Sequence, residues 1–158
     1  MISALLLDVA DTLVDTGAAM VTAGHAAAAQ LWPQAGESAH HAFGVRFHDD
    51  PRGFFGRFAA GELSFAEMRE ARAVDLAASL SLPVIDDVTR RFEESYEPVF
   101  TASLRLFDDA WPLVDAASAA GILIGPLTNS PGGEAARARA RAHGIPVVTS
   151  LSQVPALW

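Results

Sequence analysis

Hydrophobic and polar positions follow two different patterns along this chain. A continuous apolar run from Ala4 to Leu7 is closed by Asp8 and by turn-forming residues, which is typical of a buried strand that ends in a carboxylate. Similar runs at 122–127 and 145–150 predict a second and a third strand. Between the first two strands, apolar residues recur mainly at helical spacing, so the pattern predicts an α/β protein with a long helical segment near its start.

Helix-capping and helix-breaking residues divide residues 16–97 into several predicted helices and loops, with no convincing strand. Thr16 is the expected N-cap of the first helix, and Ser64 and Glu67 have the spacing of a capping box. A helix that opens at Asp86 or Asp87 is expected to end before Pro98, because proline has no N–H to donate. Other helices are expected over residues 16–32, 37–47, 54–61, 64–82, 110–120 and 134–143.

Composition narrows the class of protein. The 158 residues are 51% hydrophobic and 19% charged, which suits one globular domain or one domain with an insertion. The net charge of −8 lacks the electrostatic footprint of a protein that binds nucleic acid or an anionic membrane. All eleven basic residues are arginine and there is no cysteine, which excludes lysine Schiff bases, disulfides and thiolate sites. We expect a soluble, cytoplasmic protein without a secretory leader.

The first strand carries the strongest candidate for chemistry, since ligands of open α/β sheets bind beyond the carboxyl ends of the strands. The order apolar strand, Asp8, Thr12, Leu13 resembles motif one of the haloacid dehalogenase (HAD) superfamily, Asp-x-Asp-Gly-Thr-Leu. The resemblance implies that Asp8 is a nucleophile that forms an aspartyl ester or aspartyl-phosphate. Ala10 replaces the second Asp, which is the general acid/base of the family phosphatases. Asp11 stands where Gly is usual, and we expect it to face solvent or cap a turn.

The order of predicted elements is also similar to a HAD core with a helical cap inserted after motif one. The resemblance implies a Rossmann-type parallel sheet core of residues 1–15 and 98–158, and an all-helical cap of residues 16–97. Thr128 and Asn129 follow the second strand as in motif two, and are implied to bind the anionic group of a substrate. A strand end that feeds a helix N-terminus is a natural anion site, although an ordinary turn is the alternative.

Two further family motifs have no match in this chain. The motif-three Lys or Arg and the motif-four acidic pair normally follow the third strand, and no acidic residue follows Glu134. We therefore expect a core that is truncated after its third strand. Mg²⁺ usually takes one or two carboxylates, and here Asp8 and the backbone carbonyl of Ala10 are the implied ligands. We expect Mg²⁺ to bind weakly or not at all.

A core that ends after its third strand would leave one edge of the sheet uncovered. The resemblance implies a strand order in which the Ser3–Val9 strand would present an apolar edge, and exposed edges pair with other chains. We expect that edge to be covered by a second copy, as in a dimer, by a partner chain or by the chain's own tail.

The expected cap contains a histidine- and aspartate-rich group and an aromatic group of side chains. The first group is His40, His41, His48, Asp49 and Asp50, and the second is Phe43, Phe47, Phe54, Phe55 and Phe58. We expect the first group to form a solvated loop, because neighbouring histidines point apart. We expect the aromatic group to form the core of the cap, with the alternative that some members line a pocket facing Asp8. Arg46 is the cap cation expected to bind a carboxylate or phosphate.

Three functions remain open at this point. The first is a HAD-like hydrolase that uses Asp8 on a small phosphorylated or carboxylated metabolite. The second is a catalytically degenerate HAD-like protein, a pseudoenzyme, that acts in binding or assembly. The third is an enzyme in which Asp8 serves as a general base in non-phosphate chemistry.

Overall fold

The computed structural model describes residues 4–127. The expected third strand, the helix over 134–143, and Thr128 and Asn129 lie outside the described residues. In chain order the elements are β1 (Ala4–Asp8), α1 (Thr16–Leu31), α2 (Glu37–Asp49), α3 (Phe54–Ala59), α4 (Phe65–Ser79), α5 (Val88–Ser103), α6 (Ala110–Ala119) and β2 (Leu123–Leu127).

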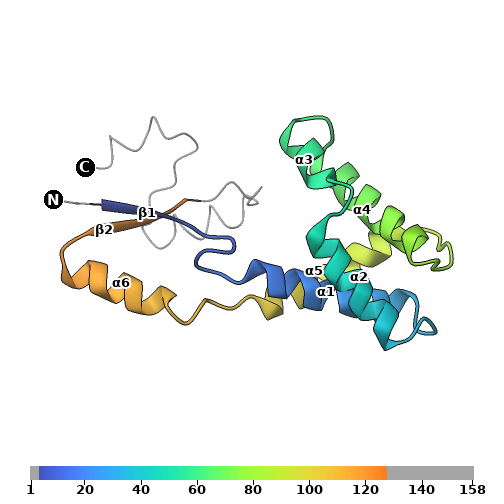
Figure 1. Ribbon diagram of the computed structural model, residues 1–158, viewed down its shortest axis with the longest axis horizontal. Helices are drawn as coiled ribbons and strands as arrows, with labels where there is room; N and C mark the ends of the chain where they lie inside the picture. The colour runs from blue at the N-terminus through green and yellow to red at the C-terminus, as the bar shows by residue number, and fades with distance from the viewer. Residues whose placement is uncertain (1–3, 128–158) are drawn as a thin grey trace.

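The elements form an α/β part, made of β1, β2 and α6, and a helical part, made of α1 to α5 (Figure 1). β1 and β2 pair in parallel, with Ala4 opposite Leu123 and Asp8 opposite Leu127. Parallel strands need a long crossover, and here the helical part and α6 provide it. The two strands and the helical segment between them confirm the predicted α/β class.

Two segments connect the parts, and they hydrogen-bond to each other. The Asp15 N–H donates to the Arg105 carbonyl at 2.9 Å, and the Phe107 N–H donates to the Leu13 carbonyl at 3.0 Å. An antiparallel bridge between Val14 and Leu106 lies between these bonds. The chain therefore leaves and re-enters the α/β part through one paired connection.

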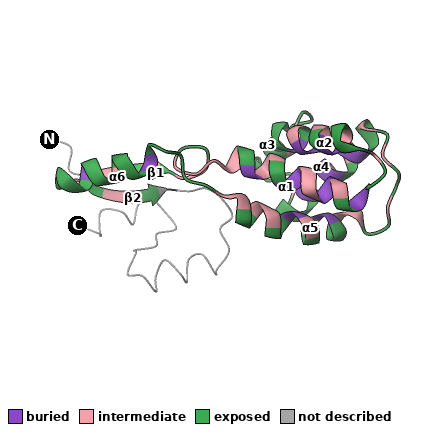
Figure 2. Cartoon of the chain, turned by 90° about the horizontal axis from the view of Figure 1, so that it is seen from below, coloured by how far each residue is buried: buried purple, intermediate pink, exposed green. Residues whose placement is uncertain are grey.

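The main hydrophobic core lies in the helical part, where α1, α2, α4 and α5 face one another. Figure 2 shows buried residues on the inward faces of these helices. Phe47 packs on Phe92 with ring centroids 4.9 Å apart, and Phe92 packs on Tyr96 at 5.2 Å. The largest fully buried side chains are Phe43, Phe47, Phe92 and Met68.

Small residues allow α1 and α2 to approach closely. A Cβ atom added to Gly44 would lie 2.3 Å from the Val21 carbonyl oxygen and 2.9 Å from the His25 nitrogen. Gly24 faces the same contact, since a Cβ there would lie 2.9 Å from the Gly44 Cα. Glycine at this crossing is therefore required by space, and fully buried Ala23, Ala27 and Ala28 continue the small-residue face of α1.

Local helix signals are mostly confirmed. The Ser64 hydroxyl accepts from the Glu67 N–H, and the Glu67 carboxylate accepts from the Ser64 N–H, which completes the predicted capping box. The predicted N-cap Thr16 is wrong by one residue, because the Asp15 side chain accepts from the Ala18 N–H and Thr16 begins α1.

The predicted end of the fifth helix is wrong. Pro98 lies inside α5, which continues to Ser103. Proline removes one intrahelical bond, but Phe92 and Tyr96 anchor the helix in the core before it, and Val99 and Phe100 pack against that core after it. The free energy gained by packing residues before and after Pro98 against the core outweighs the loss of one backbone hydrogen bond. The predicted boundary between core and cap at residue 98 remains a prediction.

Two side-chain expectations also need correction. His40, His41, His48 and Asp49 lie in α2 instead of a loop, and His40 is only 6% exposed. Of the aromatic set, Phe43 and Phe47 are core, as predicted, whereas Phe55 is 49% exposed on α3. Helix α3 packs on α4 only, so a residue on its outer side finds no second helix to cover it (Figure 1).

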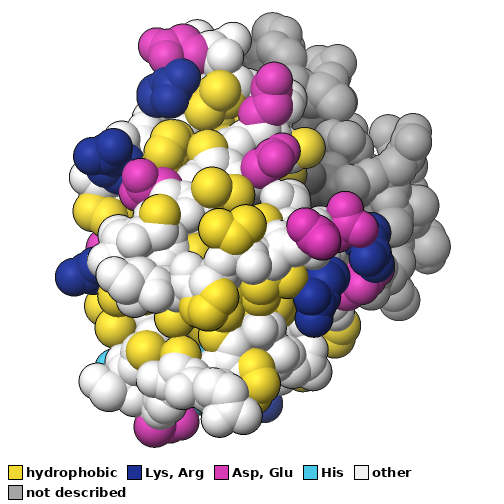
Figure 3. Space-filling view, turned by 90° about the vertical axis from the view of Figure 1, so that its right-hand side faces the viewer, with side chains coloured by type: hydrophobic (Ala, Val, Ile, Leu, Met, Phe, Trp, Pro, Cys, Tyr) yellow, Lys and Arg dark blue, Asp and Glu magenta, His cyan; other side chains and the backbone are white. Residues whose placement is uncertain are grey.

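The face of the helical part in Figure 3 carries acidic and basic side chains interspersed with hydrophobic ones. Several arginines pair with nearby acids, such as Arg57 with Glu62 at 3.1 Å and Arg90 with Glu94 at 2.7 Å. Within residues 4–127, no helix combines the length and hydropathy needed to cross a membrane.

Candidate functional site

Asp8 ends β1 and its carboxylate is exposed at the carboxyl edge of the sheet. The next residues fold into a tight turn, in which the Leu13 and Val14 N–H groups donate to the Val9 carbonyl at 3.0 and 2.9 Å. The turn brings the Thr12 hydroxyl to 3.3 Å from Asp8 Oδ2, to which it donates. Among residues 4–127, Asp8 is thus an exposed carboxylate with one weak side-chain donor.

Asp11 has a different role from Asp8. Its backbone has φ 55°, a left-handed conformation that Asp tolerates better than most residues, at the position where the HAD motif has Gly. Asp11 Oδ1 accepts from the Gly17 N–H at 2.8 Å and from the Thr16 hydroxyl. Asp11 therefore caps the N-terminus of α1, which confirms the expectation that it caps a turn.

The hydrogen bonds also set the charge of Asp11. Burial of this carboxyl acts to raise its pKa, but the bonds from Thr16 and Gly17, and the nearby His48, together lower the pKa below its ordinary value. Asp11 is therefore held ionised, with Oδ1 committed to α1.

Mg²⁺ is the ion that the resemblance to motif one implies, and the donors at this edge can be compared with its needs. Asp8 offers a carboxylate, and no backbone N–H among residues 4–127 donates to the Ala10 carbonyl. Asp11 Oδ1 is already hydrogen-bonded to the first turn of α1, so Asp8 is the carboxylate of this loop that is most available to an ion. One carboxylate plus a carbonyl meets the lower limit of what Mg²⁺ uses, with water and substrate phosphate as further ligands.

The helical part reaches the same loop through the end of α2. A Cβ atom on Gly17 would lie 3.0 Å from His48 Nε2 and 3.6 Å from Asp11 Oδ1, so His48 sits beside the start of α1. Buried Arg72 on α4 supports this end of α2 by donating to the Phe47 carbonyl and to the His48 carbonyl, the latter at 3.4 Å. Burial lowers the pKa of Arg72, and the charge of Asp50, 3.7 Å away, opposes that shift.

Sequence reasoning missed His48 as a neighbour of the motif-one loop and Arg72 as the side chain that supports the end of α2. His48 was expected in a solvated loop, and Arg72 had no local signal because its partners lie on another helix. The contact depends on how α2 and α4 pack, which residue spacing along one helix does not encode.

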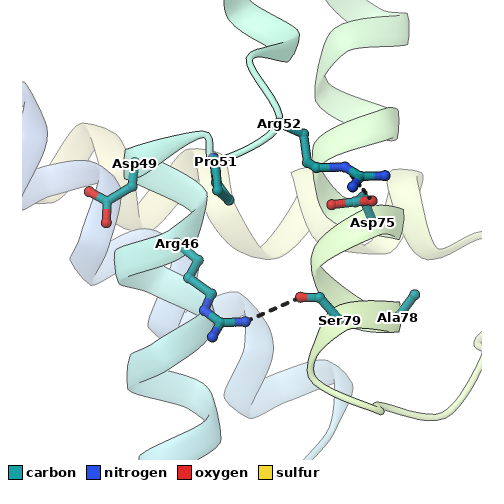
Figure 4. Close-up of a pocket in the computed structure, with 7 residues that line it drawn as sticks. All are labelled: Arg46, Asp49, Pro51, Arg52, Asp75, Ala78 and Ser79. Atoms are coloured by element: carbon teal, nitrogen blue, oxygen red, sulfur yellow. Dashed lines mark hydrogen bonds and ion pairs between the residues drawn. The ribbon is translucent and has the colours of Figure 1, made fainter.

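Arg46 lines a pocket between α2 and α4 (Figure 4). Arg46 Nη1 donates to Ser79 Oγ at 3.5 Å, and Arg52 pairs with Asp75 at 3.5 Å. No contact among the described residues joins Arg46 to Asp8. The pocket mixes both charges, since its lining is Arg46, Asp49, Pro51, Arg52, Asp75, Ala78 and Ser79.

Comparison with known proteins adds information on the fold. Neither protein-family models nor curated proteins match the sequence. Among solved structures, the chain is similar to a predicted phosphoglycolate phosphatase from Haemophilus somnus 129PT, with 15% identity and a TM-score of 0.52. The match covers 82% of this chain and 52% of that one, so the chain spans about half the length of that structure. The fold is therefore HAD-like, and this likeness concerns the fold alone.

Proposed function

We propose that this protein is a HAD-like hydrolase that uses Asp8 on a small phosphorylated or carboxylated metabolite. The observation that carries the proposal is the position of Asp8, an exposed carboxylate at the carboxyl end of β1, opposite the last residue of β2. Parallel strands place their active groups at this edge. Thr128 and Asn129 directly follow β2 in the sequence and are proposed to hold the anionic group.

For a phosphate ester, the proposed chemistry has two displacements. An Asp8 carboxylate oxygen attacks phosphorus, the bond from phosphorus to the ester oxygen breaks, and the leaving alcohol takes a proton from water. Water then attacks the aspartyl-phosphate, which releases inorganic phosphate and restores the Asp8 carboxylate. When bound, Mg²⁺ would be held by Asp8 and the Ala10 carbonyl and would neutralise phosphate charge.

Ala10 limits the rate of this chemistry. General acid–base catalysis contributes about 10²–10⁴-fold, and a methyl side chain transfers no proton. The leaving group must therefore be stable as an anion or be protonated by solvent. We expect the best substrates to have leaving groups of low pKa, such as phenols.

The test is hydrolysis of p-nitrophenyl phosphate, with and without Mg²⁺, by the wild type and Asp8→Asn. The expected result is slow turnover that Asp8→Asn abolishes and that Asp86→Asn, a change at an exposed loop aspartate, leaves unaltered. Ala10→Asp should raise turnover by about 10²-fold or more. Turnover that survives in Asp8→Asn would contradict the nucleophile assignment.

Ala10 also favours a second candidate, a HAD-like protein that binds its ligand without turning it over. No hydrolysis by wild type or Ala10→Asp, together with saturable phosphate binding that Asp8→Asn alters, would move the assignment to this role. Asp8-dependent hydrolysis of a carboxylated, phosphate-free substrate, without a covalent ester on Asp8 in a single turnover, would support the general-base alternative.

A further inference from the structure

A cluster of metal-binding side chains lies at the contact of α1 with α2, outside the site around Asp8. His25 on α1 and Glu37 and His40 on α2 each offer a ligand atom, and these atoms all lie within 4.8 Å of one another. His25 Nε2 is 3.4 Å from Glu37 Oε1, and the rings of His25 and His40 have centroids 6.1 Å apart. Glu37 and His40 are three residues apart, so they project from one side of α2.

The surroundings of His40 hold its ring in place and leave one ring nitrogen available to a metal. His40 is 6% exposed, and its Nε2 lies 2.8 Å from the Trp32 carbonyl oxygen. A carbonyl only accepts, so Nε2 carries the hydrogen and donates, which leaves the lone pair on Nδ1. Metal-binding histidines commonly donate their other ring N–H to a carbonyl in this way, because that bond fixes the tautomer and the ring.

We propose that His25, Glu37 and His40 form a Zn²⁺ site that joins α1 to α2. Two imidazoles and one carboxylate are borderline-to-hard donors, the set that Zn²⁺ accepts in sites with three protein ligands and a water. Magnesium and calcium prefer oxygen ligands, and the nitrogen donors select against them. Glu37 is exposed, with its side chain 80% accessible, so the ion can enter from solvent.

The bound ion would act on the helical part and not on the reaction at Asp8. It would fasten the start of α2 to α1 beside the Gly24–Gly44 crossing, where the two backbones are closest. Without the ion, His25 Nε2 lies 3.4 Å from Glu37 Oε1, so the two side chains already meet in the same place. Bound Zn²⁺ would therefore crosslink α1 and α2 and stabilise their contact.

The test is a Zn²⁺ titration of the full chain by calorimetry, beside Glu37→Gln and His25→Gln. We expect one Zn²⁺ per chain, a higher melting temperature with Zn²⁺, and affinity at least about 10-fold lower in each variant, since even outer-shell changes cost that much. Both positions are partly or largely exposed, and His40 is left unchanged because it is buried.

Matched controls separate this site from other donors. His48→Gln removes a histidine that also has a carboxylate, Asp49, 3.1 Å away, and it should bind Zn²⁺ like the wild type. Asp8→Asn should do the same while losing hydrolysis, so failure of this proposal and failure of the proposed function are distinguishable. Absence of saturable binding, or wild-type affinity in both Glu37→Gln and His25→Gln, would overturn the site.

Discussion

Asp11 accepts a hydrogen bond from the backbone N–H of Gly17 at 2.8 Å, across the junction between the turn after β1 and the first turn of α1. The bond connects the turn that follows Asp8, the candidate nucleophile, to α1, the first helix of the helical part. A carboxylate at this place also interacts favourably with the positive end of the helix dipole. The position of the helical part and the shape of the motif-one loop are therefore coupled.

Asp11→Ala should lower the free energy of unfolding by about 1 kcal/mol, the usual cost of losing a helix-capping oxygen. Asp11→Asn keeps an acceptor and tolerates the left-handed backbone, so it should cost less. Urea unfolding measures both, and an effect of Asp11→Asn equal to that of Asp11→Ala would contradict the capping role.

The charge of Asp11 gives the capping contribution a defined pH dependence. The pKa of Asp11 in the folded protein lies below its ordinary value, so the contribution is present above the pKa of the unfolded chain, about 4. It is lost as the pH falls through the folded pKa. The stability difference between wild type and Asp11→Asn should therefore be constant near neutral pH and shrink below about pH 4. A difference that grows in acid would contradict this linkage.

Gly44→Ala should destabilise the protein by roughly 1–3 kcal/mol or more, because the new Cβ would meet backbone atoms of α1 that cannot move aside. Gly56 on α3 is the matched control, since a Cβ there meets nothing within 4 Å. Gly56→Ala should stabilise the protein by roughly 0.5–1 kcal/mol through lower backbone entropy of the unfolded chain. Unfolding of both variants in urea tests the pair, and effects of the same sign would contradict the close helix crossing.

Tyr96, the only tyrosine, reports on the buried charges around it. Burial raises its pKa, Arg69 lowers it, and Glu93 raises it. The Arg69 guanidinium lies 4.2 Å from the Tyr96 ring centroid and makes two hydrogen bonds to Glu93, at 2.7 and 3.0 Å.

Arg69→Met should therefore raise the pKa of Tyr96 further, and Glu93→Gln should lower it. A pH titration of phenolate absorbance gives the value directly, because no other tyrosine contributes. Shifts in the same direction for the two variants would contradict the arrangement. Near-ultraviolet circular dichroism at neutral pH checks that each variant keeps its core.

Pro98→Ala should stabilise the protein by roughly 1–3 kcal/mol, because alanine restores the intrahelical bond that proline removes from the interior of α5. Pro83 offers a control outside any helix, where its carbonyl accepts from Trp32 Nε1 at 2.8 Å. Pro83→Ala should destabilise the protein by roughly 0.4–1 kcal/mol, because alanine gives the unfolded chain more conformational entropy than proline does. Thermal unfolding tests both variants, and a loss of stability in Pro98→Ala would show that the helix depends on the proline.

Local sequence signals determined much of this protein. The apolar run that stops at Asp8, the Ser64–Glu67 capping box and the Gly121 stop after α6 each act within a few residues, so spacing alone predicts them. The apolar runs predicted the two strands, whereas their parallel pairing was implied only by the family resemblance. The expected burial of the first strand is wrong for the described residues, since no residue of β1 is buried and Leu6 is 48% exposed. The candidate nucleophile was predicted because it ends an apolar strand.

Tertiary packing decided the rest. Packing of Tyr96 and Phe100 carried α5 through Pro98, and backbone bonds between Asp15 and Arg105 and between Phe107 and Leu13 paired the two connections between the parts. The convergence of His25 with Glu37 and His40, and the place of His48 beside Gly17, depend on two glycines that let α1 and α2 touch. These features join residues on different helices, and their free energy comes from contacts that exist only after the helices have packed.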